Sequence, residues 1–166
     1  MKILIYGYGN PGRRDDGLGV LFAEAIQSWA ADSELDYICC DSNYQLNIED
    51  ADNIAAFDIV VFADATVEEA IEDFKLTRLQ PSAKQSFTMH SVSPEFVLDL
   101  SARLTETPPE AYLLHLRGFE WDFMAKLTDK AASNLTAALE MMKPLLSSAE
   151  EYSLATTVDL LNNYCR

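Results

Sequence analysis

The stretch that decides the fold is residues 2–20, which read KILIYGYGNPGRRDDGLGV. Its first part, Lys2 to Tyr6, is an apolar run rich in Ile and Leu, and it predicts a buried first strand. A glycine-rich loop follows at 7–12, and apolar side chains then recur at helical spacing from Gly17 to Ala30. A strand, a glycine loop and an amphipathic helix in this order predict the first unit of an α/β sheet.

Strand-like and helix-like segments alternate through the rest of the chain. Strands are predicted at residues 35–40, 58–63, 74–79 and 112–116, and helices at 45–55, 94–104, 127–142 and 152–163. Ser93 and Pro94 form a capped helix start, and Pro144 is expected to end the helix before it. This alternation predicts an α/β fold with helices on both faces of the sheet.

Length and charge limit the class of protein. The chain has 166 residues and 49% hydrophobic content, which predicts one domain over 1–166 with a C-terminal helical tail at 150–166. Its 12 Lys and Arg against 27 Asp and Glu give a net charge of −15. So acidic a surface argues against nucleic acid and anionic membranes as partners, because both would be repelled.

The N-terminus and the cysteines bear on the compartment. No apolar stretch reaches the roughly 20 residues that span a bilayer, and residues 1–20 do not resemble a signal peptide, so we expect a cytoplasmic protein. Cys39, Cys40 and Cys165 are an odd number with two adjacent, which does not suggest a disulfide framework. No base for a catalytic thiol is evident near them.

The glycine loop has the spacing Gly7-x-Gly9-x-x-Gly12, which matches a dinucleotide-binding fingerprint. Asp15 and Asp16 at the start of the helix would repel a pyrophosphate, and a Walker lysine is absent. Nucleotide binding is therefore disfavoured.

Two acids and a histidine suggest a different chemistry. Asp16 ends the first loop, Asp64 directly follows the strand at 58–63, and His90 lies in a loop after the next strand. Ligands of open α/β sheets bind at the carboxyl ends of the strands, where these side chains are expected to meet. Two carboxylates and one imidazole are a common ligand set for a divalent transition metal.

Ordinary roles remain open for each of these residues. Asp16 also suits a helix cap, Asp64 a turn at a strand end, and His90 the surface. His115 falls inside a predicted strand, so we interpret it as structural. The Gly-x-Ser-x-Gly and His-Glu-x-x-His motifs of other hydrolases are absent.

The motifs in order resemble the hydrogenase maturation endopeptidases. The first is Gly-x-Gly-Asn, a short spacer, two acids and Gly-x-Gly-Val over residues 7–20; the others are a hydrophobic strand ending in aspartate at 60–65, a histidine loop at 89–94, and a late strand with the loop after it at 114–128. The resemblance covers residues 1 to about 142.

The resemblance implies a fold and a reaction. The fold is a three-layer αβα sandwich with a mostly parallel five-stranded sheet. The reaction removes a C-terminal extension from the precursor of a [NiFe] hydrogenase large subunit after nickel has been inserted. The family's nickel ligands correspond to Asp16, Asp64 and His90. The resemblance therefore also implies that these three are the catalytic residues of an aspartyl-type or metal-assisted endopeptidase. Asp16 stands where some members of the family have glutamate.

In this hypothesis the nickel comes with the substrate. It would polarise the scissile carbonyl or activate a water, and Asp15 or a residue of the partner would act as the base. Two alternatives stay open. One is a maturation factor that binds the hydrogenase without cutting it. The other is an enzyme similar to peptidyl-tRNA hydrolase, whose opening resembles residues 9–12 but which needs a basic surface that a charge of −15 does not suggest.

Overall fold

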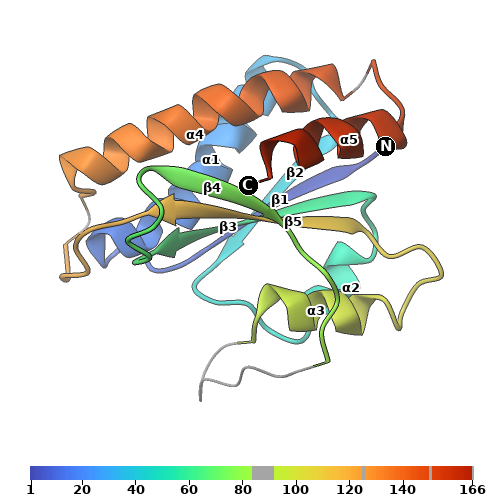
Figure 1. Ribbon diagram of the computed structural model, residues 1–166, viewed down its shortest axis with the longest axis horizontal. Helices are drawn as coiled ribbons and strands as arrows, with labels where there is room; N and C mark the ends of the chain where they lie inside the picture. Colours follow the sequence, from blue (N-terminus) through green and yellow to red (C-terminus); the bar gives the residue numbers. More distant parts are fainter. Residues whose placement is uncertain (84–91, 125, 150, 166) are drawn as a thin grey trace.

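The computed structural model describes residues 1–83, 92–124, 126–149 and 151–165 (Figure 1). Strands and helices alternate along most of this chain. The elements are β1 (Ile3–Tyr8), the short 3-10 helix η1 (Arg14–Gly17), α1 (Leu18–Asp32), β2 (Ile38–Asn43), α2 (Asp50–Ile54), β3 (Ile59–Thr66), β4 (Phe74–Arg78), α3 (Pro94–Ser101), β5 (Glu110–Arg117), α4 (Asp129–Ser148) and α5 (Leu154–Tyr164).

The five strands form one sheet in the order β2-β1-β3-β5-β4. β4 runs antiparallel to β5, and the other neighbouring strands are parallel. From β1 the chain moves outward to β2 and then returns to place β3 on the other side of β1. The order therefore reverses between β1 and β3, and the carboxyl ends of these two strands form the crevice in which open α/β sheets bind ligands.

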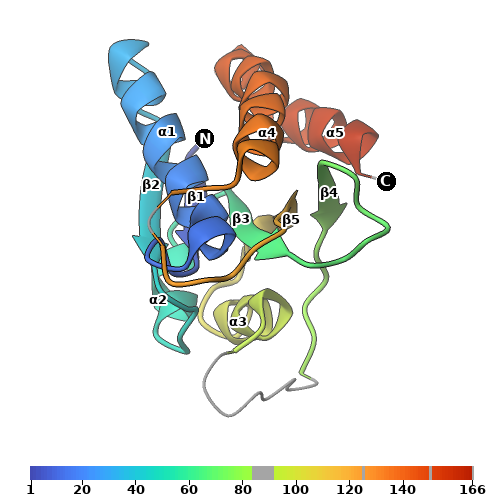
Figure 2. The same cartoon turned by 90° about the vertical axis from the view of Figure 1, so that its left-hand side faces the viewer.

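Helices cover both faces of the sheet (Figure 2). On one face, α1, α4 and α5 pack over side chains such as Val61 and Leu114. On the other, α2 and α3 pack over side chains such as Val60 and Phe62. Successive strand residues point to opposite faces, so β3 contributes to both cores. The predicted three-layer fold with a mostly parallel five-stranded sheet is confirmed.

The glycines of the opening motif allow α1 to lie very close to the sheet. A Cβ atom on Gly7 would lie 2.1 Å from the carbonyl oxygen of Gly19, and one on Gly19 would lie 2.2 Å from the carbonyl oxygen of Ala63. Neither distance leaves room for a side chain. Part of the glycine pattern that suggested a nucleotide fingerprint is therefore a requirement of helix-to-sheet packing.

Among the predicted element boundaries that were wrong, the end of α4 and the start of β2 have clear physical reasons. α4 runs through Pro144 to Ser148 and does not end before the proline. The missing N–H removes one helical hydrogen bond, but Met142, Leu145 and Leu146 are buried around it, and this packing outweighs the local preference. The second strand begins at Ile38 and not at residue 35, because the chain first completes a turn in which Leu35 N donates to Ala30 O at 2.9 Å.

The C-terminal segment packs on the body of the protein. Ser93 caps α3 as predicted, and Ser153 caps α5 in the same way, since its side chain accepts a hydrogen bond from Thr156 N. Leu161 of α5 is buried in the core that α1 and α4 share.

None of the helices formed by the described residues combines the length and apolarity needed to cross a membrane. The three cysteines are free thiols.

Candidate functional site

Asp64 lies within β3, near its carboxyl end, and not just after the strand as the sequence suggested. It follows Val60 and Phe62 at a spacing of two residues, so its side chain lies on the face of the sheet that α2 and α3 cover. Tyr8, at the end of β1, lies on this face for the same reason, after Leu4 and Tyr6. The sheet thus brings a partly buried carboxyl and a phenol together at the reversal of strand order.

Asp16 reaches the same place from the glycine loop. Gly9 has a φ of 133°, which a residue with a side chain rarely adopts, and this turn directs the chain from β1 back toward η1. The Oδ2 atom of Asp16 then accepts a hydrogen bond from Asn10 N at 3.2 Å. Gly17 is the residue that precedes α1, and no side chain caps that helix. The alternative role of Asp16 as a helix cap is therefore wrong.

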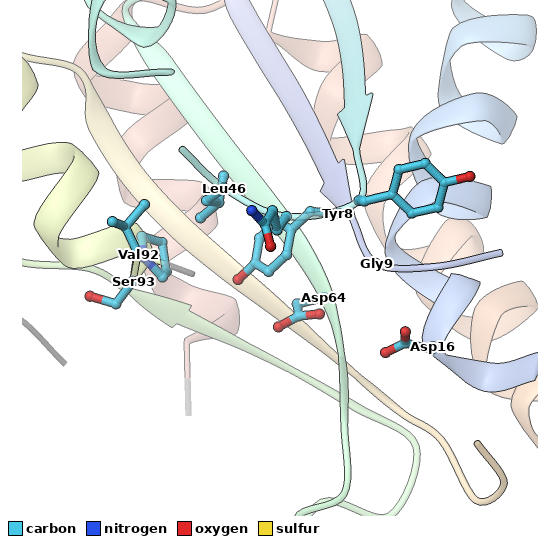
Figure 3. Close-up of a pocket in the computed structure, with 10 residues that line it drawn as sticks. Tyr8, Gly9, Asp16, Leu46, Asp64, Val92 and Ser93 are labelled. Carbon is cyan, nitrogen blue, oxygen red and sulfur yellow. The ribbon is translucent and has the colours of Figure 1, made fainter. Parts of the chain in front are cut away.

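Both carboxyl groups line one cavity of about 340 Å³ (Figure 3). The cavity is open to solvent, and the residue Val92, which begins the described chain after the gap, borders it with Ser93. The full set of lining residues is Tyr8, Gly9, Asp16, Tyr44, Gln45, Leu46, Asp64, Val92, Ser93 and Pro94. In Figure 3, Asp64 lies in the middle, with Asp16 on one side and Val92 and Ser93 on the other.

The environment of Asp64 makes its protonation sensitive near neutral pH. Burial raises the pKa of Asp64 to about 7, and the negative charge of Asp16 adds to that rise, while hydrogen bonds from Tyr8 and from the backbone of Ala65 oppose it. Burial also raises the pKa of Tyr8 well above its ordinary value, so its hydroxyl stays protonated and serves as the donor to Asp64. A cation in the cavity would favour the ionised carboxylates at both positions.

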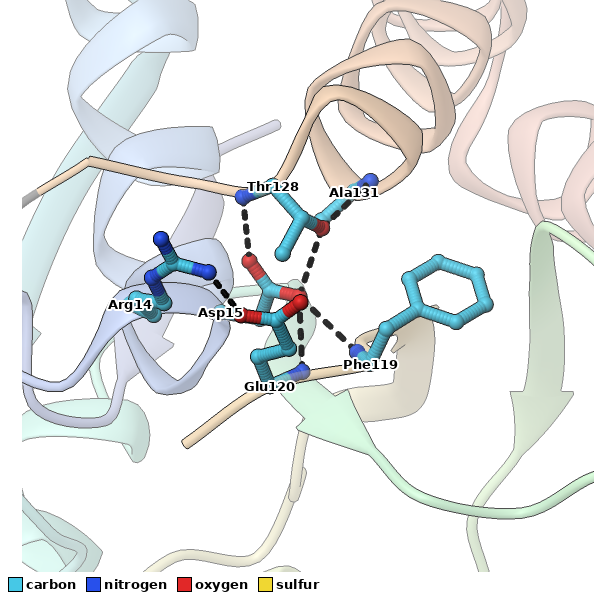
Figure 4. Close-up of polar contacts among 6 residues, drawn as sticks. All are labelled: Arg14, Asp15, Phe119, Glu120, Thr128 and Ala131. Carbon is cyan, nitrogen blue, oxygen red and sulfur yellow. Dashed lines mark hydrogen bonds and ion pairs between the residues drawn. The ribbon is translucent and has the colours of Figure 1, made fainter. Parts of the chain in front are cut away.

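Asp15 does not face this cavity. Its side chain is fully buried, and its oxygens accept hydrogen bonds from the backbone nitrogens of Phe119, Glu120 and Thr128 and from the Thr128 hydroxyl, at 2.8 to 3.1 Å (Figure 4). The hypothesis that Asp15 acts as a general base was therefore wrong. Its four hydrogen bonds hold the loop after β5 against η1, just before α1.

The two histidines lie in different parts of the chain. His90 lies outside the described residues. His115 is paired in register with Asp64 across β3 and β5, and its Nε2 atom lies 3.0 Å from the Thr77 hydroxyl. Burial lowers the pKa of His115. Within 1–83, 92–124, 126–149 and 151–165, no three His, Cys, Asp or Glu side chains are grouped so as to hold a metal ion, so His115 does not complete a site with Asp16 and Asp64.

Sequence reasoning missed Tyr8 and Tyr44 as residues of the site. Tyr8 was only the variable position between two glycines. The signal that identifies it is the alternation along β1, which places Tyr8 on the same face as Tyr6 and at the carboxyl end. Tyr44 follows β2 and lines the cavity with an exposed ring, and no motif in the sequence indicates this.

Comparison with known proteins gives one curated relative and several similar structures. The chain is 29% identical over 149 residues to the hydrogenase expression/formation protein HupD of Thiocapsa roseopersicina, an alignment that covers 84% of this chain. The chain spans about two thirds, 65%, of that relative's length. No protein-family model matches the chain.

Two solved structures illustrate the similarity of fold. The hydrogenase maturating endopeptidase HybD from E. coli superposes with a TM-score of 0.64 at 21% identity, covering 91% of this chain and 94% of that one. The [NiFe] hydrogenase maturation protease HycI from Thermococcus kodakarensis superposes with a TM-score of 0.68 at 21% identity, covering 88% and 92%. The resemblance seen in the motifs is thus confirmed in sequence and in fold.

Proposed function

We propose that this chain, a relative of the hydrogenase maturation proteases, is an endopeptidase that removes a C-terminal extension from the precursor of a [NiFe] hydrogenase large subunit. The observation that carries the proposal is the shared cavity of Asp16 and Asp64 at the carboxyl edge of the sheet. Support also comes from the relative, which is named a hydrogenase expression/formation protein, and from the two similar structures, which are named a hydrogenase maturating endopeptidase and a [NiFe] hydrogenase maturation protease.

In this proposal nickel is part of the substrate. Asp16 and Asp64 contact the nickel of the loaded precursor, and His90 supplies the third ligand. The hard carboxylate oxygens and the imidazole suit such an ion, and the open side of the cavity leaves space for ligands from the precursor. A precursor without nickel would present no cation to offset the repulsion between the two carboxylates, so it would bind poorly.

In this proposal the scissile peptide bond lies beside the nickel. A cavity of about 340 Å³ accepts a short extended segment but not a folded domain, which fits a substrate tail. The metal polarises the scissile carbonyl or lowers the pKa of a bound water. Tyr8 orients Asp64 through their hydrogen bond. The carboxylate of Asp15 already accepts four hydrogen bonds. The base that takes the proton from water is therefore a group of the substrate or one of the carboxylates that bind the metal.

The test is the intact mass of a nickel-loaded large-subunit precursor before and after mixing with this protein. The proposal expects loss of a C-terminal peptide with nickel-loaded precursor only. Asp16→Asn, Asp64→Asn and His90→Gln should each abolish that loss. Asp52→Asn, an exposed acid on α2, is the control variant and should process normally.

An unchanged mass with the wild-type protein and a matching precursor would contradict the proposal and favour the binding factor that does not cut. Loss of the peptide from a nickel-free precursor would contradict the role of nickel while leaving the peptidase. A cytoplasmic location and the lack of nucleic-acid binding remain predictions from the sequence.

A further inference from the structure

The loop that follows β5, residues 118–124, exposes an unusual group of side chains. It contains three aromatic residues and a methionine, and Phe123 is 84% exposed, Met124 50% and Phe119 37%. Aromatic residues, Met and Arg are the types enriched at protein–protein interfaces. Exposed apolar side chains gathered in this way mark a contact surface more often than isolated ones do.

This aromatic loop is held in place despite its exposure. Asp15 accepts from the backbone nitrogens of Phe119 and Glu120, and Arg14 N donates to Met124 O at 2.6 Å. Arg14 also forms an ion pair with Glu120. A surface fixed before binding loses less conformational entropy when a partner arrives. Figure 4 shows the carboxylate of Asp15 at the centre of this anchor.

The charge around the aromatic loop differs from that of the whole chain. The chain carries −15, yet five of its twelve basic residues belong to this region: Arg13, Arg14, Arg117, Lys126 and Lys130. Three of them lie over aromatic rings. Arg13 is 5.4 Å from the ring centroid of Phe123, and Arg117 and Lys130 are 5.4 and 5.5 Å from that of Phe119.

Most of these cations lack an acidic partner. Within the described part of the chain, only Arg14 of the five forms an ion pair. Exposed acids nearby include Asp122, Asp129 and Asp73, whose backbone carbonyl accepts a hydrogen bond from Arg117 N, yet among the described residues none of these acids forms an ion pair with the other four cations. Buried nitrogens of Arg13 (Nε) and Arg117 (Nη1) also have no hydrogen-bond acceptor among the described residues. These nitrogens are themselves buried, so a partner's carboxylate would pair with the other guanidinium nitrogens of Arg13 and Arg117.

We infer that the aromatic loop, with Arg13 and Arg117, is the surface on which the precursor docks, and that it takes an apolar side chain flanked by carboxylates. The inference rests on the function proposed above. Asp15 anchors the loop and the adjacent Asp16 lines the cavity, so a precursor seated on the loop has its tail beside Asp16 and Asp64. Recognition of the folded precursor is thus separate from contact with the metal.

The experiment separates binding from cutting. The affinity of the nickel-loaded precursor is measured for the Asp64→Asn protein, which the proposed function expects not to cleave the substrate, and for the same protein carrying Phe123→Ala or Arg117→Gln. Each loop substitution should weaken binding at least about tenfold, as expected for residues at the centre of an interface. With Asp64 intact, the loop variants should process slowly at low precursor concentration and regain their rate as the concentration rises.

Two controls match the loop substitutions. Leu104→Ala removes an exposed apolar side chain, and Arg103→Gln removes a cation. Both residues belong to the segment between α3 and β5, which leads into β5 at the opposite end of that strand from the aromatic loop (Figure 1). Both should bind within about twofold of the parent protein. Phe123 is mostly exposed, so its truncation should leave the melting temperature unchanged, and a weakened affinity then reports the contact itself.

The outcomes keep the two proposals apart. Normal cleavage by wild-type protein, together with unchanged affinity in both loop variants, would overturn the docking surface and leave the peptidase standing. Equal weakening by Leu104→Ala would overturn it as well. A precursor that is neither bound nor cut by the wild-type protein would contradict the proposed function itself, and the docking surface with it.

Discussion

Asp15 and Asp16 are adjacent in the chain, but their carboxylates lie in different environments: Asp15 is buried with four hydrogen-bond donors, whereas Asp16 lines the cavity with Asp64. The preceding residue, Arg14, has a φ of 48°, a conformation that turns the backbone sharply. Two neighbouring acids thereby take separate roles, one in holding the aromatic loop and one in the site.

The first prediction concerns Asp15. Asp15→Asn keeps the size of the side chain but removes its charge and directs an amide NH₂ toward groups that are themselves donors. We expect a loss of about 3 kcal/mol in the free energy of unfolding, because buried hydrogen bonds to a charged group are lost. Urea denaturation measures it. A change smaller than about 0.5 kcal/mol would contradict the anchoring role.

The second prediction concerns Asp16. Asp16→Asn should fold with a stability within about 1 kcal/mol of wild type, because its carboxylate is partly exposed and accepts a backbone hydrogen bond from Asn10 that an amide oxygen can also accept. It should nevertheless lose processing of the nickel-loaded precursor, as followed by intact mass. Asp15→Asn is the matched comparison, because its main expected effect is a loss of stability, whereas the main expected effect of Asp16→Asn is a loss of processing. An Asp16→Asn protein that processes at the normal rate would exclude Asp16 from the site.

Much of the fold follows from local pattern. β1 and β3 are predictable because both are buried on two faces and read as continuous apolar runs, and Ser93-Pro94 marks the start of α3 by capping chemistry alone. The edge of the sheet on which Asp16 and Asp64 meet is also predictable, because parallel strands align their carboxyl ends. Each of these features can be predicted because it depends on residues that are close together in the sequence.

Other features depend on contacts between distant residues. Nothing in the Asp15-Asp16 pair says which acid turns inward, because the donors to Asp15 come from Phe119, Glu120 and Thr128, more than 100 residues away. The continuation of α4 through Pro144 likewise depends on packing against the sheet. The hydrogen bond between Tyr8 and Asp64 depends on two strands that become neighbours only after folding.

The third prediction tests that hydrogen bond. The Tyr8 hydroxyl lowers the pKa of Asp64 against the effect of burial, so Tyr8→Phe should raise the pKa of Asp64 above about 7. If nickel is held by the ionised carboxylate, the acid limb of the processing rate should move to higher pH in this variant. Rates measured from pH 5.5 to 8.5 test this. Tyr44→Phe, in the same cavity, should leave the midpoint of that limb in place.

The fourth prediction concerns stability against pH. The pKa of Asp64 is about 7 in the folded protein and about 3.9 in an unfolded chain, so between these values the folded state holds a proton that the unfolded state has lost. Stability contributed by this group is therefore full below about pH 4 and falls as the pH rises through about 7.

Asp64→Asn removes this dependence. As the pH rises from 5 to 8, the free energy of unfolding of the variant should increase relative to that of wild type by about 2 kcal/mol, a figure reduced to allow for the partial exposure of Asp64. Urea unfolding of both proteins at each pH gives the difference, with Asp52→Asn as a control that should show none. A constant difference between pH 5 and 8 would show that Asp64 is ionised throughout.

The last prediction returns to the opening motif. Gly19→Ala places a methyl group 2.2 Å from the Ala63 carbonyl oxygen and 2.5 Å from that of Tyr8, both of them backbone atoms that cannot rotate away. Helix α1 must then move off the sheet, and we expect a loss of about 3 kcal/mol of stability. The rate of processing should fall as well. Tyr8 and Asp64 lie next to the contact between Gly19 and the two strands, and Asp16 directly precedes the helix that moves, so all three would shift relative to one another.

Gly12→Ala is the matched control for this test. A Cβ at Gly12 would meet only the side-chain oxygen of Asn10, at 3.1 Å, so the substitution should cost less than about 1 kcal/mol. Thermal or urea unfolding compares the two variants directly. If Gly19→Ala and Gly12→Ala were equally mild, then α1 would not need its close approach to β1 and β3, and the glycine spacing would require a ligand rather than packing to explain it.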